Sequence, residues 1–377
     1  MKIGLVLDDS LDRTDGVQQY VLCVGQWLQL RGHEVYYLTG ETTRTDPKRI
    51  HSLSRNVKVR FNGNQLSVPL PASYSKLRRL LTQLDLDVLH VQVPYSPFMA
   101  GRLLRLVGPK VAVVGTFHIL PYGPLAQFGS NVLGKINSAT ARRFDAMMAV
   151  SRPTQVFAAR HFGFMSIVVA NPFHHDAFSV KRRGRLSSTA VKRIVYLGRL
   201  VERKGPYELV QAIAELERKK LTSTPYEVII AGKGILRPKL EQFTKENHIT
   251  DKIVFSGFVE ESDKATLLAS GDIVVFPSTA GESFGISLLE GMAAGRGVVL
   301  AGDNPGYASV VADKKQLFDP LDTAAFAEIL AKWLNDDKAR MAMAKIQQTY
   351  VQQFDIDVIG PKIEELYAHA LQKRRHS

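Results

Sequence analysis

The sequence predicts an α/β protein with two domains, each a doubly wound parallel sheet of the Rossmann-like kind. Short apolar runs suited to buried strands alternate with segments of helical periodicity along almost the whole chain. The 377 residues also exceed the usual size of a single hydrophobic core. We therefore expect an N-terminal domain over residues 1–172 and a C-terminal domain over residues 173–354.

Composition excludes several classes of protein. The hydrophobic content of 45% is ordinary for a globular protein, and no apolar run approaches the ~20 residues that span a bilayer. The N-terminus carries one lysine before a strand-like segment rather than a signal peptide, so we expect a cytoplasmic protein. The single cysteine, Cys23, lies in an apolar helical pattern and can form no disulfide within the chain. We assign it no chemistry.

The chain is strongly basic. Lysine and arginine total 49 against 36 aspartate and glutamate, which gives a formal net charge of +13. Such an excess suits nucleic acid, anionic lipid or phosphorylated substrates. Because no zinc-finger spacing or RNA-binding aromatic pattern accompanies the charge, we expect an anionic lipid surface and a sugar nucleotide as partners, and no nucleic acid.

The chain opens with a β-loop-α unit, formed by a strand at Lys2–Leu7, a polar loop and a helix over residues 17–31. Gly16 stands at the start of this helix, where phosphate oxygens can approach free backbone N–H groups, although one glycine in a polar loop is more often only a turn. Further strands are expected at residues 34–38 and 57–61, and a tight turn at Asn62-Gly63-Asn64.

Residues 73–84 have the pattern of a basic amphipathic helix. Leu77, Leu80, Leu81 and Leu84 fall on one helical face, and three basic residues, Lys76, Arg78 and Arg79, cluster near the start. Helices on the surface of globular proteins often look the same, so a solvated basic face explains the pattern as well as membrane binding does. The overall charge of the chain favours the membrane surface.

His118 directly follows Thr116-Phe117, at the end of a buried-strand pattern over residues 111–116. Ligands of doubly wound sheets bind at the C-terminal ends of strands, so His118 is better placed for function than an arbitrary histidine. From position alone, a structural role remains the simpler interpretation. Other elements of this half are strands at Val88–Val91, 146–150 and 167–169, a helix from the Ser151 N-cap to Phe162, and a linker from Asn171-Pro172.

The second domain begins after the basic tract at residues 181–185, with a strand at 193–197. Arg199 follows this strand, and Lys204 stands at the start of a helix that runs to about residue 220. Two cations at a strand end and a helix start can neutralise a diphosphate, whereas isolated cations would be surface charges.

The remaining strands are expected at residues 227–231, 253–256, Ile273–Phe276 and 298–301, and the remaining helices at 287–294, Thr323–Asn335, 337–350 and 355–372. Gly232-Lys233-Gly234 lacks the full dinucleotide glycine fingerprint, which argues against a nicotinamide enzyme. Lys373-Arg374-Arg375-His376 is expected to be a disordered basic tail.

The most informative stretch is Gly281-Glu282-Ser283-Phe284-Gly285-Ile286, with Glu290 following it. It lies between an expected strand and an expected helix, where free N–H groups favour anions and glycines allow a ligand to approach closely. Either carboxylate alone is explained by helix capping. The pair of glutamates with seven residues between them, around Ser-Phe-Gly, is much harder to explain that way.

This motif resembles the donor signature of retaining GT-B glycosyltransferases, the large family that includes phosphatidyl-myo-inositol mannosyltransferases and glycolipid glucosyltransferases. The resemblance covers nearly the whole chain, and it implies two domains facing a central cleft, with a last helix at about residues 355–372 that packs back on the first domain. Short matches on the acceptor side are Gly16-Val17-Gln18, Asn62-Gly63, the basic helix and Thr116-Phe117-His118.

The resemblance also implies roles for individual residues. Glu282 is expected to bind sugar hydroxyls, Glu290 the nucleotide ribose, Arg199 and Lys204 the diphosphate, and His118 the donor sugar. These residues are joined in the donor site by Gly16, Gly232, Lys233, Phe258, Val259, Ser283, Phe284, Gly285 and Ile286. The acceptor is expected to contact Gln18, Asn62 and His118, and the membrane Lys76, Arg78 and Arg79.

The implied reaction uses no cofactor and no metal. The substrate is a GDP- or UDP-hexose, and the acceptor attacks from the face that the diphosphate leaves, with that diphosphate as base. Asp85-Leu86-Asp87 resembles the metal-binding pair of another glycosyltransferase class, but it precedes a strand instead of following one, and His174-His175 has no third ligand at a suitable spacing. We therefore predict no catalytic metal.

The acceptor is expected to be a membrane lipid, such as phosphatidylinositol or a diacylglycerol glycolipid, reached from the inner face of the cell membrane as a peripheral protein. A soluble sugar or polysaccharide acceptor remains open. So do a sugar-nucleotide epimerase and a binding protein on the same fold. The donor base, the hexose and the oligomeric state are not specified by the sequence.

Overall fold

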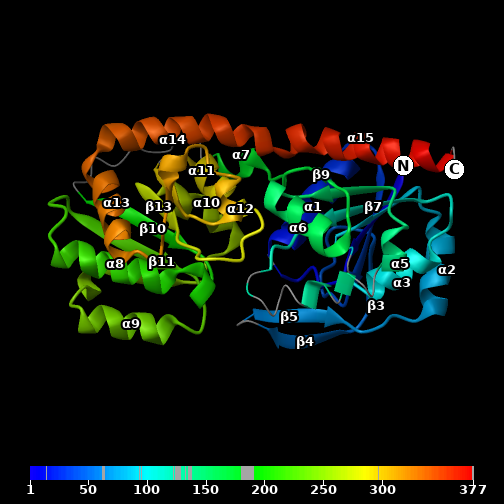
Figure 1. The fold of residues 1–377 in the computed structure, drawn as a ribbon, viewed down its shortest axis with the longest axis horizontal. Helices are drawn as coiled ribbons and strands as arrows, with labels where there is room; N and C mark the ends of the chain where they lie inside the picture. Colours follow the sequence, from blue (N-terminus) through cyan, green and yellow to red (C-terminus); the bar gives the residue numbers. More distant parts are fainter. Residues whose placement is uncertain are drawn as a thin grey trace. The chain divides into compact units, whose positions relative to one another are not determined.

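The computed structural model describes residues 1–13, 15–61, 64–92, 94, 96–121, 123, 129–131, 133–134, 138–179, 191–295 and 297–375. They form two compact units (Figure 1). Unit 1 comprises Met1–Phe173 and Phe354–Ser377, and unit 2 comprises His174–Gln353. The boundaries predicted from the sequence lie within one residue of these.

Among the described residues, unit 1 holds a seven-stranded sheet in the order β3-β2-β1-β6-β7-β8-β9, with every pairing parallel. Its inner strands are apolar without alternation and are buried on both faces, as a sheet covered by helices on both sides requires. The strands are β1 (Lys2–Leu7), β2 (Glu34–Gly40), β3 (Ile50–Ser54), β6 (Val88–Val91), β7 (Ala112–Phe117), β8 (Ala146–Ala149) and β9 (Ile167–Val168).

The described helices of unit 1 are α1 (Gly16–Leu30), α2 (Tyr74–Leu84), α3 (Met99–Leu106), α5 (Ser138–Ala141), α6 (Arg152–Phe162) and α15 (Ile356–Arg375). The start of α6 is fixed as the sequence predicts, because the Ser151 side chain accepts from the backbone N–H of Thr154 in a capping box.

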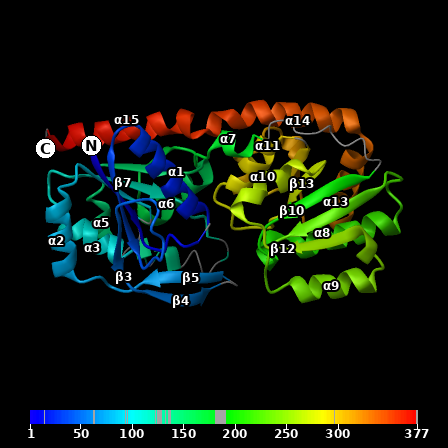
Figure 2. The same cartoon turned by 180° about the vertical axis from the view of Figure 1, so that it is seen from behind.

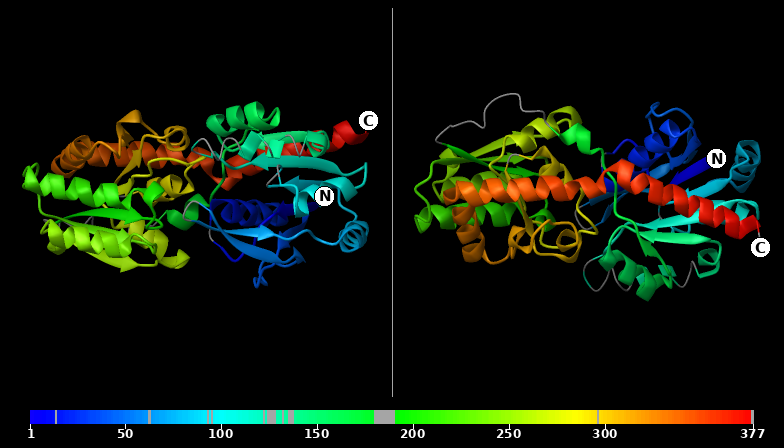
Figure 3. Two further views of the ribbon diagram at one scale, coloured as in Figure 1. Left: turned by 60° about the horizontal axis from the view of Figure 1, so that its bottom comes forward. Right: turned by 90° about the horizontal axis from the view of Figure 1, so that it is seen from above.

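The last helix, α15, packs on α1 and β7 of unit 1, and Figure 3 shows it in red. The indole Nε1 of Trp27 donates to Asp357 over 2.8 Å. A Cβ at Gly360 would lie 2.6 Å from the Trp27 ring, so glycine is what permits this close approach. The contact ties the end of the chain to its first helix.

The predicted disordered tail is wrong for residues 373–375, which continue α15. The guanidinium of Arg374 lies 2.6 Å from a carboxylate oxygen of Asp145, and Lys373 donates to the carbonyl of Asp145. Basic side chains near a helix C-terminus also complement the helix dipole. His376 lies outside the described residues.

The region after β2 adds two features to the sequence analysis. The segment predicted as a strand at residues 57–61 is present as β4 (Asn56–Phe61), but it pairs antiparallel with β5 (Asn64–Pro69) in a separate hairpin, visible in Figure 2. The edge of the main sheet is instead β3, which the sequence analysis missed. It is polar and only partly buried, so its apolar signal is weak.

The leucine face of α2 is part of the core of unit 1. Leu77 and Leu84 are buried, and Leu80 and Leu81 pack against the same cluster from partly buried positions. The three basic residues of this helix are exposed instead, although Nζ of Lys76 donates to the carbonyl of Ser52 over 3.2 Å. An interpretation in which the leucines enter a membrane is therefore wrong, because they already pack against protein. None of the described helices has the length and apolarity that crossing a bilayer demands.

Unit 2 holds a six-stranded sheet among its described residues, in the order β12-β11-β10-β13-β14-β15, again with every pairing parallel. The chain winds outwards from β10 in one direction and then from β13 in the other, so the switch point lies between these two strands. The strands are β10 (Lys192–Leu197), β11 (Tyr226–Ala231), β12 (Ile253–Gly257), β13 (Ile273–Phe276), β14 (Val298–Gly302) and β15 (Leu317–Phe318).

The helices of unit 2 are α7 (His175–Phe178), α8 (Pro206–Arg218), α9 (Arg237–Glu246), α10 (Glu261–Ala269), α11 (Ile286–Ala294), α12 (Pro305–Ala308), α13 (Thr323–Asn335) and α14 (Asp337–Val351). Short 3-10 turns lie at Glu202–Lys204, Thr250–Lys252, Lys314–Gln316 and Gln352–Phe354.

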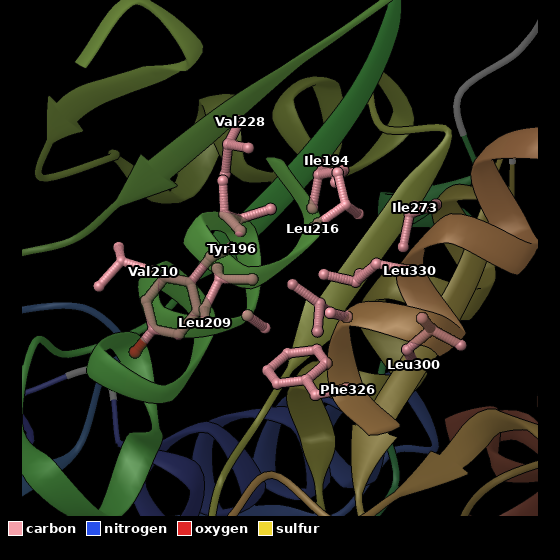
Figure 4. Close-up of a cluster of buried hydrophobic side chains, with 14 of the residues drawn as sticks. Ile194, Tyr196, Leu209, Val210, Leu216, Val228, Ile273, Leu300, Phe326 and Leu330 are labelled. Carbon is pink, nitrogen blue, oxygen red and sulfur yellow. The ribbon is translucent and has the colours of Figure 1, made fainter. Parts of the chain in front are cut away.

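One core cluster joins α8 and α13 to the sheet of unit 2 (Figure 4). Leu209 and Leu216 lie on the same face of α8 and are fully buried. The ring of Phe326 from α13 stacks on the ring of Phe318, with 4.2 Å between the ring centroids. This packing fixes β10 and the start of α8. The loop between these two elements carries Arg199, Arg203 and Lys204.

Candidate functional site

Four side chains of unit 2 meet beyond the C-terminal ends of β10 and β13. The ammonium Nζ of Lys204 lies 2.7 Å from Oε1 of Glu282, and Nη1 of Arg203 lies 2.8 Å from the same oxygen. The hydroxyl of Ser278 lies 2.7 Å from that oxygen as well. The side chains of Lys204, Arg203 and Glu282 are only 20%, 15% and 12% exposed. Two cations thus share one nearly buried carboxylate oxygen.

Close backbone packing brings the two loops together. Gly205 has a left-handed backbone with φ of 71°, and a Cβ there would lie 1.9 Å from the carbonyl oxygen of Pro277. The N–H of Thr279 donates to the carbonyl of Arg203 over 3.0 Å, and the hydroxyl of Ser278 lies 2.7 Å from the same carbonyl. The loop after β10 is therefore held against the end of β13 by the protein's own contacts.

The charges of this cluster do not cancel. Burial would raise the pKa of Glu282, but the charges of Lys204 and Arg203 outweigh it and the pKa is lowered. Burial lowers the pKa of Lys204, and the charges of Arg203 and Arg199 lower it further. The charge of Glu282 raises this pKa, but the lowering effects are larger. Two cations thus act directly on one carboxylate and the charge of Arg199 reaches Lys204, which leaves an excess of positive charge that suits an anion.

The predicted motif residues after Glu282 form the start of α11. Gly285 is its N-cap with φ of 137°, and no side chain caps the first turn. A Cβ on Gly285 would lie 2.8 Å from the ring of Tyr307, so the turn requires glycine. Phe284 is buried, whereas Ser283 and Ile286 are partly exposed. First-turn N–H groups at such a helix start suit an anion or a sugar oxygen.

Glu290 lies on α11 and has a partner that sequence analysis missed. Nζ of Lys264, on α10, lies 3.0 Å from Oε1 of Glu290 and 2.9 Å from Glu261. Burial opposes the charge of Lys264, but the two carboxylates outweigh it and raise its pKa. Glu290 is 5% exposed. The two motif glutamates are thus held by separate cations, Glu282 by Lys204 and Arg203, and Glu290 by Lys264.

Backbone contacts at the ends of β10, β11 and β12 bring four predicted donor residues together. A Cβ at Gly232 would lie 1.8 Å from the carbonyl oxygen of Gly198, and the N–H of Gly232 donates to Gly257. Nζ of Lys233 lies 5.2 Å from the centre of the Phe258 ring, which is 54% exposed. Val259 is partly exposed beside it. An exposed ring under a cation is a surface suited to a planar base.

In unit 1, Gly16 is the first residue of α1, as its predicted position requires. Gln18 is buried, and its Nε2 donates to Asp9 over 3.2 Å and to the carbonyl of Ser10 over 3.1 Å. This side chain therefore orders the loop between β1 and α1. Asn62, another of the three predicted acceptor residues, lies outside the described residues.

His118 sits directly after β7, and both of its immediate neighbours were missed by the sequence analysis. Its Nε2 lies 2.9 Å from Oε1 of Gln92, and the ring of Tyr20 meets it edge-on at 4.8 Å. Burial lowers the pKa of His118 to about 3, so the ring is neutral at physiological pH.

A second buried carboxylate, Asp8, lies at the end of β1. Its carboxylate accepts from the N–H of Ala100 at the start of α3 over 2.8 Å and from the hydroxyl of Ser96. Burial, partly offset by these hydrogen bonds, raises the pKa of Asp8 to about 7. Asp8 caps α3, which explains its burial without a ligand.

The Asp85-Leu86-Asp87 pair has structural partners at the opposite end of the strands. Asp87 accepts from the backbone N–H of Lys2 over 2.7 Å, and Asp85 is the left-handed C-cap of α2. Over the parts of the chain that the structure describes, no three histidine, cysteine or acidic side chains gather as metal ligands.

Comparisons with known families assign each half of the chain. Residues 14–176 match the family model described as "Glycosyltransferase Family 4". Residues 179–349 match the family model described as "Glycosyl transferases group 1". The two matches meet at the boundary between unit 1 and unit 2.

Curated relatives span the full length of the chain. A phosphatidyl-myo-inositol mannosyltransferase of Propionibacterium freudenreichii is 29% identical over 98% of this chain and 95% of its own length. Its namesake from Mycobacterium leprae is 28% identical over 97% and 96%. An N-acetyl-alpha-D-glucosaminyl L-malate synthase of Bacillus anthracis is 24% identical over 98% and 97%.

Solved structures share the fold at low sequence identity. The Anabaena protein HepE, crystallised in complex with UDP, aligns with a TM-score of 0.77 at 18% identity, covering 98% of this chain and 100% of its own. Sucrose-phosphate synthase from Thermosynechococcus elongatus aligns with a TM-score of 0.77 at 19% identity, covering 98% and 99%.

We predict that Glu282→Gln lowers the free energy of unfolding at pH 7 by about 2 to 4 kcal/mol, because it leaves Lys204 and Arg203 without their shared counter-charge. The folded pKa of Glu282 is lowered, so its stabilisation is present above the ordinary value of 4.5 and fades as the pH falls below it. Urea unfolding at pH 7 and pH 3.5 measures this difference.

The matched control is Glu241→Gln, which breaks the exposed pair of Glu241 with Arg237. It should cost less than about 1 kcal/mol. An equal cost for both substitutions at pH 7, or a cost of Glu282→Gln that persists unchanged at pH 3.5, would contradict the assigned ion pair.

Proposed function

The chain is a GT-B glycosyltransferase built from a family 4 half and a group 1 half, and on this premise we propose that it transfers a hexose from a nucleoside diphosphate sugar to a membrane lipid. The full-length relatives named phosphatidyl-myo-inositol mannosyltransferases support mannose as the hexose and a phosphatidylinositol lipid as the acceptor. The carrying observation is the pairing of Arg203 and Lys204 with Glu282, with the charge of Arg199 acting on Lys204.

That cluster suits a sugar diphosphate on chemical grounds. The excess cations match the charge that grows on the diphosphate as its bond to the sugar breaks. A carboxylate beside them accepts hydrogen bonds from sugar hydroxyls. Glu290, held by Lys264, is proposed to bind the ribose, and the Lys233–Phe258 surface the base, which we expect to be guanine or uracil.

We propose transfer with retention of configuration and without a metal. The cations would take the role that a metal ion has in other phosphate-leaving reactions, so the diphosphate departs towards them and then serves as base for the incoming acceptor. His118 is proposed to contact the transferred hexose through its neutral ring. At the start of α1, Gly16 remains a proposed contact of the donor, and Gln18 remains a proposed contact of the acceptor.

The acceptor proposal rests on α2 as well as on the relatives. With its leucines in the core, the helix offers only its basic face, where Lys76, Arg78 and Arg79 are exposed. Tyr74 is 41% exposed, with the Arg102 guanidinium 4.7 Å from its ring centre. Arg102 lies on α3, so the cationic surface extends beyond α2. We infer an electrostatic attachment to the inner face of the cell membrane.

A soluble acceptor is the alternative that the comparisons favour next, because the relative from Bacillus anthracis is named for L-malate. The protein is incubated with a panel of nucleotide sugars and either membrane lipid extract or soluble acceptors. Mass spectrometry of the products then decides between a lipid and a soluble acceptor. A hexosylated phosphatidylinositol supports the proposal. Product formed only with soluble acceptors, or epimerised sugar without transfer, would overturn the lipid acceptor.

Replacing Lys204 tests the role of the cation cluster. Lys204→Ala is expected to lower kcat by a factor on the order of 100 or more, because charge stabilisation at the departing diphosphate is lost. Arg218→Ala is the control, since Arg218 is 68% exposed on α8 and pairs only with Glu215 and solvent among the described groups. Steady-state kinetics of both variants should separate them, and normal turnover of Lys204→Ala would sink the assignment.

Membrane attachment through α2 predicts a salt-sensitive binding to anionic vesicles. Changing Lys76, Arg78 and Arg79 together to Gln should remove about 3 kcal/mol, or roughly a hundredfold in partitioning, at about 1 kcal/mol for each basic residue. Vesicle sedimentation with and without anionic lipid measures the loss.

A control variant changes three exposed lysines of unit 2 to Gln, which alters the net charge by the same amount. These lysines are Lys314, Lys338 and Lys345. Equal sedimentation of the two triple variants would remove α2 as the attachment surface. Failure of the unmodified protein to bind any vesicle would instead favour a soluble acceptor.

A further inference from the structure

The side chain of Gln92 is buried in a place where a polar group is costly. It is fully buried beside His118, its Oε1 accepts from Nε2 of His118, and its Nε2 has no hydrogen-bond partner among the described residues. An unpaired buried amide group costs free energy, and an apolar side chain of the same size would not. Stability alone therefore does not explain glutamine here.

The backbone fixes Gln92 relative to His118. Gln92 directly follows β6, and its N–H donates to the carbonyl of Val6 on β1 over 3.0 Å. His118 follows β7, which pairs in parallel with β6. The two side chains therefore leave neighbouring strand ends and meet at a fixed distance. The hydrogen bond places the proton of the neutral ring on Nε2, so Nδ1 is the ring's acceptor.

A second chain of hydrogen bonds holds the residue two positions before His118. The hydroxyl of Tyr367 on α15 lies 2.6 Å from Nδ1 of His90, and Nε2 of His90 lies 2.6 Å from the hydroxyl of Thr116. All three side chains are buried. This chain supports the end of β7 from the side of α15, whereas Gln92 acts on His118 itself.

Among the described residues, no counter-charge pairs with His118. The titratable groups that face it are the phenol of Tyr20 from α1 and the imidazole of His90 from β6, and Tyr367 from α15 lies behind His90. Burial lowers the pKa of His90 to about 3 and raises that of Tyr20, so both are neutral. No described carboxylate forms a hydrogen bond or ion pair with His118.

We propose that Gln92 is a positioning residue that holds His118 in one neutral tautomer, with Nδ1 as the hydrogen-bond acceptor. The inference rests on the proposed function, in which His118 contacts the transferred hexose. In glycosyl transfer the sugar becomes positively charged as the leaving group departs. A neutral acceptor suits such a centre, whereas an imidazolium would repel it. A neutral amide fixes the ring without raising its pKa, which a carboxylate in the same place would do.

The tautomer is read by NMR of the full-length protein labelled with ¹⁵N in its histidine rings. The chain has ten histidines, so the spectrum of His118→Gln identifies the signal of His118. In the unmodified protein His118 should show one neutral tautomer with Nε2 protonated, unchanged between pH 5 and 8. A single midpoint near pH 6.5, or the opposite tautomer, would overturn the proposal.

Two substitutions of Gln92 separate charge from shape. In Gln92→Glu an opposite charge at hydrogen-bond distance should raise the pKa of His118 by about 1 to 3, and the rate should then fall on the acidic side as the ring becomes charged. Gln92→Met keeps the size and removes the acceptor. It should mix the two tautomers and lower kcat roughly tenfold to a hundredfold, the range known for the outer hydrogen-bond partners of metal-ligating histidines, with a smaller change in KM.

Tyr367→Phe is the control, because it breaks the chain through His90 without touching Gln92. It should alter the signal of His90 and leave the tautomer and titration of His118 unchanged. If Gln92→Met keeps the tautomer of His118 and the kcat of the unmodified protein, Gln92 has no positioning role. Absence of transfer by the unmodified protein with any donor would defeat the proposed function, while the NMR result would still decide whether Gln92 sets the tautomer.

Discussion

The shared carboxylate of Glu282 is the interaction on which the candidate site of unit 2 depends. Lys204 and Arg203 come from the loop after β10, and Glu282 from the loop after β13, so one oxygen atom connects the two strands at the switch point of the sheet. Gly205 permits the approach by having no side chain against Pro277. Without the contact between Glu282 and the two cations, Lys204 and Arg203 would be separate surface charges. Water would then weaken the interaction of their charges with an anion.

The two units prepare their candidate residues in opposite electrostatic ways. In unit 2, charges are concentrated and partly buried, with Glu282 and Glu290 each held by cations on a different element. In unit 1, His118 lies among neutral groups, and burial keeps it and His90 uncharged. This contrast fits a reaction in which negative charge grows on a leaving diphosphate while positive charge grows on the sugar.

The sequence predicted what depends on local pattern. Strands such as Ile273–Phe276 are continuous apolar runs, and the cap at Ser151 is a local signal, so both match the structure. The edge strand β3 was missed because it is polar and half-buried. Lys264 and Gln92 were missed because each is defined by a partner far away in sequence, Glu290 or His118. Arg203 had a signal, since it adjoins Lys204, but its contact with Glu282 required the folded loop.

The ion pairs of Glu282 also bear on how a donor would bind. The carboxylate compensates part of the positive charge of Arg203 and Lys204, to which Arg199 adds at Lys204, and the remaining positive charge suits a diphosphate ester. In the proposed complex, sugar hydroxyls would share Glu282 and the diphosphate would take the cations. The ion pairs of Glu282 therefore keep Lys204 and Arg203 together and already largely removed from water. When the diphosphate binds, these cations exchange one anionic partner for another, so little further desolvation free energy is required.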